Sequence, residues 1–419
     1  MNKLPKGFFA DGLHCGIKKN GKKDLSLFYS EKPCVAAGVF TKNIFKAAPV
    51  IVSQKNIKNK IHSIVANSGC ANACTGERGI KDAKKTCELT AKELKVKPGN
   101  ILVASTGVIG QYLPMDKIKI GVKKLTRLPA YPLTHSPLSA VEGIMTTDTF
   151  PKIVSKKFFL PSLSLRHRRT YSAIPYPFAT GEPTRLSTVS IWACAKGSGM
   201  IEPNMATMLS FILTDAKIKK EALSRALKIA TEKSFNCLTV DGDTSTNDTV
   251  FVLANGEAKN EIIPGGENFR LFCDKLTAVC VELTKMLARD GEGATKLITV
   301  NVKGAKTIAD AKKIAKTVAN SPLVKTAIFG NDANWGRIVA AIGRSEVKVD
   351  PKKVDVSFGN LCVFKKGSPI VFSELEAKKI LNQKEVNLNL NLNLGGSSAT
   401  VYTCDFTEGY IKINASYRS

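Results

Sequence analysis

The second half of the chain alternates between two spacings of hydrophobic residues. Three segments place apolar residues every three or four positions, as a helix with one buried face requires: 217–233, 268–289 and 308–319. Three shorter segments are almost continuously apolar, which is typical of buried strands: 207–214, 249–254 and 297–302. This alternation of strands and helices predicts a mixed α/β fold.

The first half follows the same pattern less regularly. Four short segments have the composition of strands: 25–30, 35–40, 61–65 and 101–104. Between the last two, residues 81–94 have helical spacing. We therefore expect strands and helices to be mixed along the whole chain.

Residues 386–394 near the C-terminus alternate strictly between asparagine and an aliphatic residue. A period of two buries one face of a strand and leaves the other polar. Gly395 and Gly396 follow, and a second strand-like segment comes at 399–406. We expect the two strands to form a β-hairpin.

One segment departs from the rest of the chain in composition. Lysine is absent between Lys157 and Lys196, while arginine and proline accumulate there. Only residues 189–194 have the composition of a strand. We expect an irregular insert over about residues 158–188.

Length and composition indicate a globular protein. The chain has 419 residues, of which 43% are hydrophobic, so it can bury a large core. It contains no apolar run near the roughly 20 residues that span a bilayer, and its N-terminus lacks the apolar core of a signal peptide. We predict a cytoplasmic protein that does not enter a membrane.

The eleven cysteines do not suggest a disulfide framework. Their number is odd, and they are scattered through predicted strands and helices, so we expect buried free thiols. Cys70 and Cys74 form a close pair, but a metal site needs two further ligands, which we cannot assign among the four histidines. We predict no bound metal and no bound cofactor.

The formal net charge of +27 raises the alternative of a nucleic-acid-binding protein. The lysines, however, occur in pairs along the whole chain, with few aromatic residues between them and no recognisable nucleic-acid-binding motif. Solvated helix faces explain this distribution better, so we predict no nucleic-acid partner. A positive field would still concentrate an acidic substrate.

The turn that follows Lys196 ends on a hydroxyl residue, Thr207, which opens an apolar strand. Gly197, Gly199 and Pro203 bend this turn. Such a sequence can simply mark the start of a strand. It also suits self-cleavage, in which the hydroxyl attacks the preceding carbonyl and the resulting ester is hydrolysed.

Cleavage between Ala206 and Thr207 would create a nucleophile that carries its own base. The α-amine of an N-terminal threonine has an ordinary pKa of about 8, so near neutrality it can accept the proton of its own hydroxyl. No histidine is needed for this step.

Short motifs along most of the chain resemble the ornithine acetyltransferase family, the arginine-biosynthesis enzymes also called glutamate N-acetyltransferases. Each motif alone is weak evidence for the family, but the order in which all of them occur along the chain is specific to it. They lie at residues 12–18, 37–43, 67–76, 105–110, 146–152, 196–209, 241–249, 290–296, 334–338 and 412–419.

The resemblance implies an α/β fold with four layers, two stacked β-sheets flanked by helices, similar to the N-terminal-nucleophile hydrolases. It also implies self-cleavage into an α chain, residues 1–206, and a β chain, residues 207–419. Family members assemble from two copies of each chain, so the expected assembly is a heterotetramer.

The resemblance also assigns roles to particular residues. Thr207 is the nucleophile and amine base, and Thr106 with Gly107 forms the oxyanion hole. The substrate-binding positions that match the family are Thr146, Lys196, Thr207, Glu292, Asn414 and Ser419. Lys196 is expected to bind a carboxylate, and Glu292 the substrate ammonium or side chain. The motif at Trp335 is compatible with packing or with a direct role.

Three hypotheses for the function follow. The first is an acetyltransferase that moves acetyl from N2-acetylornithine to glutamate through acetyl-Thr207, with acetyl-CoA as an additional donor. The second keeps the fold and the self-cleavage but makes the enzyme an aminopeptidase or amidase, in which water removes the acyl group. The third is a non-catalytic basic protein that binds nucleic acid.

Overall fold

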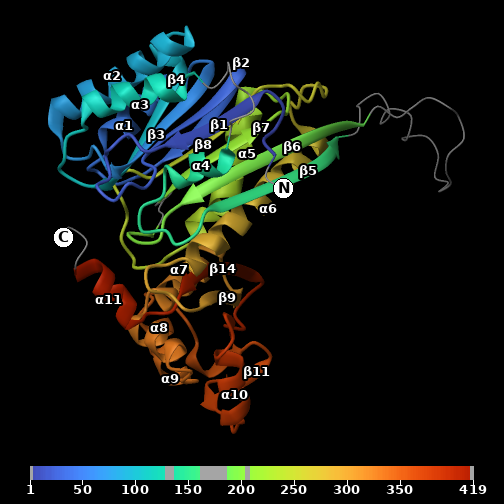
Figure 1. The fold of residues 1–419 in the computed structure, drawn as a ribbon. Coiled ribbons are helices and arrows are strands. Elements are labelled where there is room, and N and C mark those ends of the chain that lie inside the picture. The colour runs from blue at the N-terminus through green and yellow to red at the C-terminus, as the bar shows by residue number, and fades with distance from the viewer. Residues whose placement is uncertain (1–2, 128–135, 161–185, 203–207, 416–419) are drawn as a thin grey trace, which may run out of the picture.

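The computed structural model describes residues 3–127, 136–160, 186–202 and 208–415. It contains two β-sheets with helices packed against both, and the last third of the chain builds the smaller sheet (Figure 1). The mixed α/β fold predicted from the alternation of segments is confirmed.

The larger sheet has eight strands in the order β4-β3-β2-β8-β7-β6-β5, with β1 also paired to β2. Their bounds are β1 Phe8–Leu13, β2 Leu25–Phe40, β3 Ile61–Cys70, β4 Ile101–Val108, β5 Lys152–Leu160, β6 Ser187–Lys196, β7 Leu209–Thr214 and β8 Thr249–Ala254. The predicted strands 25–30 and 35–40 are a single strand, because β2 continues from its pairing with β3 into its pairing with β8.

This long strand lets the larger sheet supply two stacked layers. One layer contains β1, β3, β4 and the first half of β2, and the other contains β5–β8 and the second half of β2. An apolar core joins Phe28 of the first layer to Trp192, Phe211 and Phe251 of the second. The rings of Phe28 and Phe211 meet edge to face with centroids 5.1 Å apart. The two layers therefore face each other across this inner core.

Helices cover the outer face of each layer. On the first layer lie α1 Ala48–Asn56, α2 Gly76–Leu94 and α3 Met115–Leu125. On the second lie α5 Lys220–Glu232 and α6 Gly266–Arg289, while the short α4 Pro137–Glu142 packs at the inner core. The helices α2, α3, α5 and α6 each have an apolar stripe that a sheet buries. The four-layer sandwich expected from the sequence is confirmed.

The smaller sheet has its own apolar core and was not part of that expectation. Its six strands run in the order β12-β11-β10-β13-β9-β14. Their bounds are β9 Leu297–Ala305, β10 Asp355–Phe358, β11 Leu361–Lys365, β12 Ser368–Pro369, β13 Glu385–Asn391 and β14 Ser397–Cys404. The helices of this part are α7 Ile308–Ala319, α8 Pro322–Phe329, α9 Trp335–Gly343, α10 Glu374–Leu381 and α11 Glu408–Ala415. Trp335 stacks on Phe364 with ring centroids 5.0 Å apart, which favours packing for this residue.

The hairpin predicted from Gly395 and Gly396 is wrong. β13 pairs with β9 in parallel, and β14 pairs with the opposite edge of β9. The reason lies at the end of β9, where the Gly304 carbonyl accepts hydrogen bonds from the N–H groups of Leu394, 2.7 Å, and Gly395, 2.9 Å. The glycines therefore carry the chain around the end of β9 rather than back along β13.

The ends of the predicted insert at 158–188 are strands, which corrects that expectation. β5 and β6 pair continuously from Lys152 opposite Ala195 to Leu160 opposite Ser187. Phe158 and Leu160 are buried, so their apolar side chains decide the structure despite the unusual composition that follows. Residues 161–185 lie outside the described part of the chain.

All eleven cysteines are free thiols and eight of them are buried, as predicted. No helix among the described residues is both long enough and apolar enough to cross a membrane. The same residues contain no group of three or more His, Cys, Asp or Glu placed to hold a metal ion.

Candidate active site

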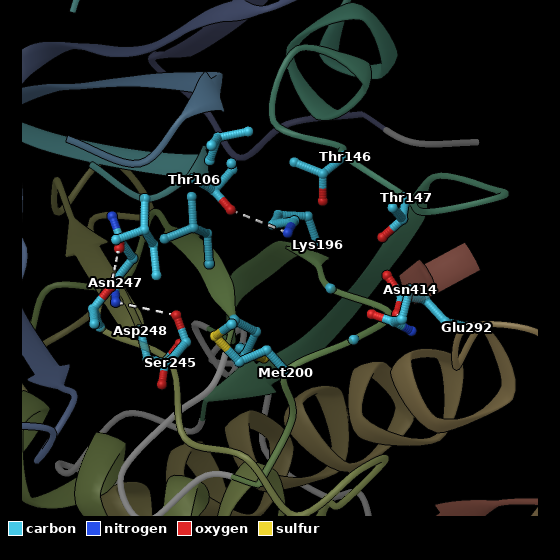
Figure 2. A pocket seen from close by; sticks show the side chains of 18 residues that line it. Thr106, Thr146, Thr147, Lys196, Met200, Ser245, Asn247, Asp248, Glu292 and Asn414 are labelled. Atoms are coloured by element: carbon cyan, nitrogen blue, oxygen red, sulfur yellow. Dashed lines mark hydrogen bonds between the residues drawn. The ribbon is translucent and has the colours of Figure 1, made fainter. Parts of the chain in front are cut away.

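Thr106 and Lys196 meet at one edge of the inner core. Ala104 on β4 and Cys194 on β6 both face that core. Because strand side chains alternate, the residues two positions further, Thr106 and Lys196, point to the same side as these neighbours. The Lys196 ammonium donates a hydrogen bond of 3.2 Å to Thr106 Oγ1 (Figure 2). Two strands from different layers thus bring together two residues that lie 90 positions apart.

A cavity of about 280 Å³ opens at this point. It is lined by all of the predicted site residues that the structure describes: Thr106, Gly107, Thr146, Lys196, Glu292 and Asn414. Met208, the residue that follows Thr207 in the sequence, lines it too. The predicted residues Ala206, Thr207 and Ser419 lie outside the described residues. A cavity of this size accommodates a molecule comparable to an amino acid.

Gly107 occupies a place where no other residue fits. Its φ is +127°, and a Cβ there would lie 2.4 Å from the Gly69 carbonyl carbon on the neighbouring strand. The register between β3 and β4 is irregular here, at Gly69 and Cys70. Such irregularities re-aim the backbone at strand ends. The turn after Thr106 therefore presents backbone rather than a side chain toward the end of β3.

Lys196 is a buried cation, with 7% of its surface exposed. Burial lowers the pKa of its ammonium, while the nearby Asp148 carboxylate acts in the opposite direction. Thr106 Oγ1 accepts one hydrogen bond from this ammonium, which has three donors in all. Lys196 is thus suited to bind an anionic group of a small molecule, such as a carboxylate.

Glu292 and Asn414 form another side of the cavity, and Lys196 lies between them and Thr106 (Figure 2). The Asn414 amide donates a 2.9 Å hydrogen bond to Glu292 Oε2. A Cβ at position 199 would lie 2.2 Å from the same oxygen, so this close approach requires Gly199. The carboxylate of Glu292 is therefore held in place and can bind a cationic group.

The sequence analysis missed a set of polar residues around the cavity. The missed lining residues include Thr147, Ser245, Thr246, Asn247 and Asp248. The Asn247 amide donates to the backbone oxygens of Ala71, 2.6 Å, and Ser105, 2.8 Å, and so ties the ends of β3 and β4 together. The available signal was a run of hydroxyl, amide and acidic residues immediately before a buried strand, where binding residues often lie.

A buried ionic network below the cavity was also missed. The Lys152 ammonium lies 2.7 Å from Asp148 Oδ1 and 2.5 Å from Asp290 Oδ2, and all three side chains are at most 2% exposed. The Gly197 N–H donates to Asp148 Oδ1 at 2.7 Å. The network thus links β5 and the end of α6 to the turn that follows Lys196. The spacing of Asp148 and Lys152 in the sequence did not indicate a partner as distant as Asp290.

Charge and hydrogen bonds determine how Asp148 titrates. Burial alone would raise the pKa of its carboxyl, but Lys152 and Lys196, together with hydrogen bonds from Lys152 and the Thr146 N–H, hold it below its ordinary value. A lowered pKa in the folded state stabilises the fold above the unfolded-state pKa of about 3.9. This contribution is lost as the pH falls below that value.

The chain is firmly attached on both sides of residues 203–207. Upstream, the Asp241 carboxylate accepts hydrogen bonds from the N–H groups of Met200, 2.6 Å, and Ile201, 2.8 Å. Met200 has a φ of +55°, which is uncommon for a residue other than glycine. Downstream, the Met208 carbonyl accepts a 2.9 Å hydrogen bond from the Thr249 N–H. These contacts hold the described residues on both sides of positions 203–207.

The fold and the cavity are those of an α/β protein with a polar pocket that can hold a small molecule carrying both a carboxylate and a cationic group. Comparison with known proteins specifies this class. The model of the ArgJ family matches residues 9–167 and 178–419. The arginine biosynthesis bifunctional protein ArgJ of Symbiobacterium thermophilum is 48% identical, over 99% of this chain and 98% of its own length. The corresponding protein ArgJ 1 of Clostridium acetobutylicum is also 48% identical, over 98% and 96%.

A crystal structure of the arginine biosynthesis bifunctional protein ArgJ from Bacillus halodurans is 46% identical in sequence, with a TM-score of 0.49. The match covers 50% of this chain and 99% of the chain in the crystal structure. The family match and the full-length identities place the chain in the ArgJ family. It is an acetyltransferase of arginine biosynthesis. Of the three hypotheses drawn from the sequence, the family assignment selects the acetyltransferase.

Proposed function

We propose that the chain cleaves itself between Ala206 and Thr207 and then moves acetyl from N2-acetylornithine to glutamate, through an acetyl ester on Thr207. The observation that carries this proposal is that one cavity collects Thr106, Gly107, Lys196, Glu292 and Met208. These residues come from three separate parts of the sequence.

The attachments around residues 203–207 support self-cleavage. Since Asp241 holds the backbone upstream and Thr249 holds it downstream, the segment connects two fixed points. Met208, which directly follows Thr207 in the sequence, lines the cavity, which supports chemistry at the preceding residue.

The acyl transfer needs a nucleophile, a base and donors for the oxyanion of the tetrahedral intermediate. No histidine is among the described residues that line the cavity. The α-amine released by cleavage would therefore serve as the base. Thr106 accepts a hydrogen bond from Lys196, which leaves its own proton as a donor, and the Gly107 N–H is the second donor of the proposed oxyanion hole.

The charges in the cavity match the substrates of this reaction. Lys196 would bind a carboxylate, which both N2-acetylornithine and glutamate possess. Glu292, supported by Asn414, would bind the ammonium of the ornithine side chain or of glutamate. Thr146, and Ser419 beyond the described residues, complete the proposed binding positions.

We extend the proposal to acetyl-CoA as a second donor, because the curated relatives are named bifunctional proteins. A cytoplasmic location agrees with the eleven free cysteines, because thiols stay reduced there. An assembly of two copies of each fragment remains a prediction.

The proposed function is tested by incubating the purified, cleaved enzyme with N2-acetylornithine and glutamate. We expect equal amounts of ornithine and N-acetylglutamate, measured by mass spectrometry. The release of ornithine without N-acetylglutamate would show hydrolysis instead, and would refute the transferase.

Removing the Thr106 hydroxyl should slow catalysis while leaving binding largely intact. We expect Thr106→Val to lower kcat by a factor of about 10²–10³, because one oxyanion donor is lost, with a smaller change in KM. Steady-state kinetics with both substrates measures this effect. Thr106→Ser keeps the hydroxyl and is the matched control. A Thr106→Val enzyme with a kcat near that of the wild type would remove Thr106 from the oxyanion hole.

A further inference from the structure

A second cavity, of about 390 Å³, adjoins the catalytic one. We call it the lysine pocket, and its principal lining residues are Lys18, Lys22, Lys23, Glu142, Thr146 and Asp148. Thr146 lines both cavities, so the two lie next to each other at this residue. Its neighbour Asp148 anchors it, because Asp148 Oδ2 accepts the Thr146 N–H at 2.9 Å.

The two acidic residues of the lysine pocket have cations of their own. Glu142 Oε2 lies 2.7 Å from the Lys23 ammonium, and Asp148 Oδ1 lies 2.7 Å from that of Lys152. In contrast, neither Lys18 nor Lys22 forms an ion pair with any of the described residues. The lysine pocket therefore has an excess of positive charge that a ligand anion could neutralise.

Lys18 lies on the side of the lysine pocket that is nearer to the catalytic residues. Its ammonium donates to the carbonyls of Met145, 2.6 Å, and Lys23, 2.8 Å, which leaves one of its three donors for a ligand. Burial lowers the pKa of Lys18 to about 8; the nearby Asp24 and Asp148 carboxylates oppose this shift, and repulsion from Lys196 adds to it. The positive field thus continues from the catalytic cavity into the lysine pocket.

Lys22 lies on the exposed side, on a turn that is held in place. Its carbonyl is 2.9 Å from His14 Nδ1, and its N–H donates to Asn20 Oδ1 at 3.1 Å. The adjacent Gly21 has a φ of +74°, which permits the turn. The backbone of Lys22 is therefore fixed while its side chain is exposed to incoming ligands.

We propose that the lysine pocket binds the phosphate groups of an acyl-CoA donor. This inference rests on the proposed function, which includes acetyl-CoA as a donor. The catalytic cavity, at about 280 Å³, has room for an amino acid but not for a nucleotide as well. A donor whose acetyl group reaches Thr207 must place its phosphates outside that cavity, and the pantetheine arm would connect the two sites past Thr146.

The chemistry of this half-reaction follows the proposed mechanism. The Thr207 oxygen attacks the thioester carbonyl, a C–O bond forms and the C–S bond breaks. The hydroxyl proton passes through the α-amine to the sulfur, and the thiol of CoA leaves. The acetyl ester is the same as that formed from N2-acetylornithine, so only the first step depends on the lysine pocket.

The two donors allow the lysine pocket to be tested separately from the catalytic residues. Kinetics of Lys22→Ala and Lys22→Glu are measured with each donor at saturating glutamate. We expect KM for acetyl-CoA to rise about 3-fold for Lys22→Ala and about 10-fold or more for Lys22→Glu, because a contact to phosphate is lost and then replaced by repulsion. The KM for N2-acetylornithine should change less than about 2-fold. Lys19→Glu is the matched control, since Lys19 is an exposed lysine on the same turn but does not line the lysine pocket.

A second measurement identifies the group that is bound. Adenosine 3′,5′-bisphosphate should inhibit the acetyl-CoA reaction of the wild type competitively and inhibit Lys22→Glu weakly, with inorganic phosphate as the weaker probe. Unchanged KM values for acetyl-CoA in Lys22→Glu, or equal changes for both donors, would overturn the inference. A rise in KM for glutamate alone would also overturn it, because the pocket would then bind the acceptor carboxylate. If the wild-type enzyme shows no activity with one of the two donors, the proposed use of that donor is refuted instead.

Discussion

Thr207→Ala should yield a single chain of 419 residues, whereas the wild type should yield two fragments, residues 1–206 and 207–419. The substitution would remove the hydroxyl that we propose attacks the Ala206 carbonyl, and with it the proposed nucleophile of the transfer reaction. We therefore expect acetyl transfer to fall by a factor of at least about 10³. Intact-mass spectrometry and the two-substrate assay measure the two effects on the same preparation.

Thr207→Ser is the matched control for this experiment. It keeps a hydroxyl and creates an N-terminal amine after cleavage, so two fragments and measurable transfer are expected. Efficient cleavage of Thr207→Ala would place the processing chemistry elsewhere. A wild-type chain that is active but uncleaved would separate catalysis from processing and contradict the proposed amine base.

Lys152→Met should destabilise the fold by about 3–5 kcal/mol. Lys152 separates the carboxylates of Asp148 and Asp290, and all three side chains are almost completely buried. Methionine has a similar length but no charge, so the two carboxylates would lose the cation that lies between them. We expect the apparent Tm to fall by roughly 5–10 °C in thermal unfolding at neutral pH.

Lys156→Met on the same strand provides the control. Lys156 forms an ion pair of 3.7 Å with Glu282, and their side chains are 36% and 55% exposed. An exposed pair of this kind contributes at most about 1 kcal/mol, because solvent screens it. Equal losses of Tm in the two variants would mean that the buried network has no special role in stability.

Periodicity predicted the helices and strands of this fold well where one element packs on one sheet. The helix at 308–319 and the strand at 249–254 have the predicted bounds. The hairpin failed because Gly395 and Gly396 are compatible with any sharp turn, and only the pairing with β9 decides its direction. Periodicity likewise could not indicate that β2 spans two layers, because that depends on the partners of each half of the strand.

The candidate site was predictable as a set of residues but not as a shape. Motifs pointed to Thr106, Lys196 and Glu292, and these residues line one cavity. Nothing local in the sequence links Lys152 to Asp290, since their contact depends on how α6 ends beside β5. The lysine pocket was equally hidden, because Lys22 and Lys23 look like any other surface pair until Glu142 neutralises one of them.

The strand order of the larger sheet has a consequence for the proposed cleavage products. The neighbours run β2-β8-β7-β6, so two strands that follow Thr207 lie between two strands that precede it. After cleavage, neither fragment can leave without breaking a full ladder of hydrogen bonds on each side of the inserted pair. Each fragment alone would also expose unpaired strand edges, which promote aggregation. The two products of cleavage should therefore behave as one inseparable particle, and a gene split at this point should require both halves to be made together.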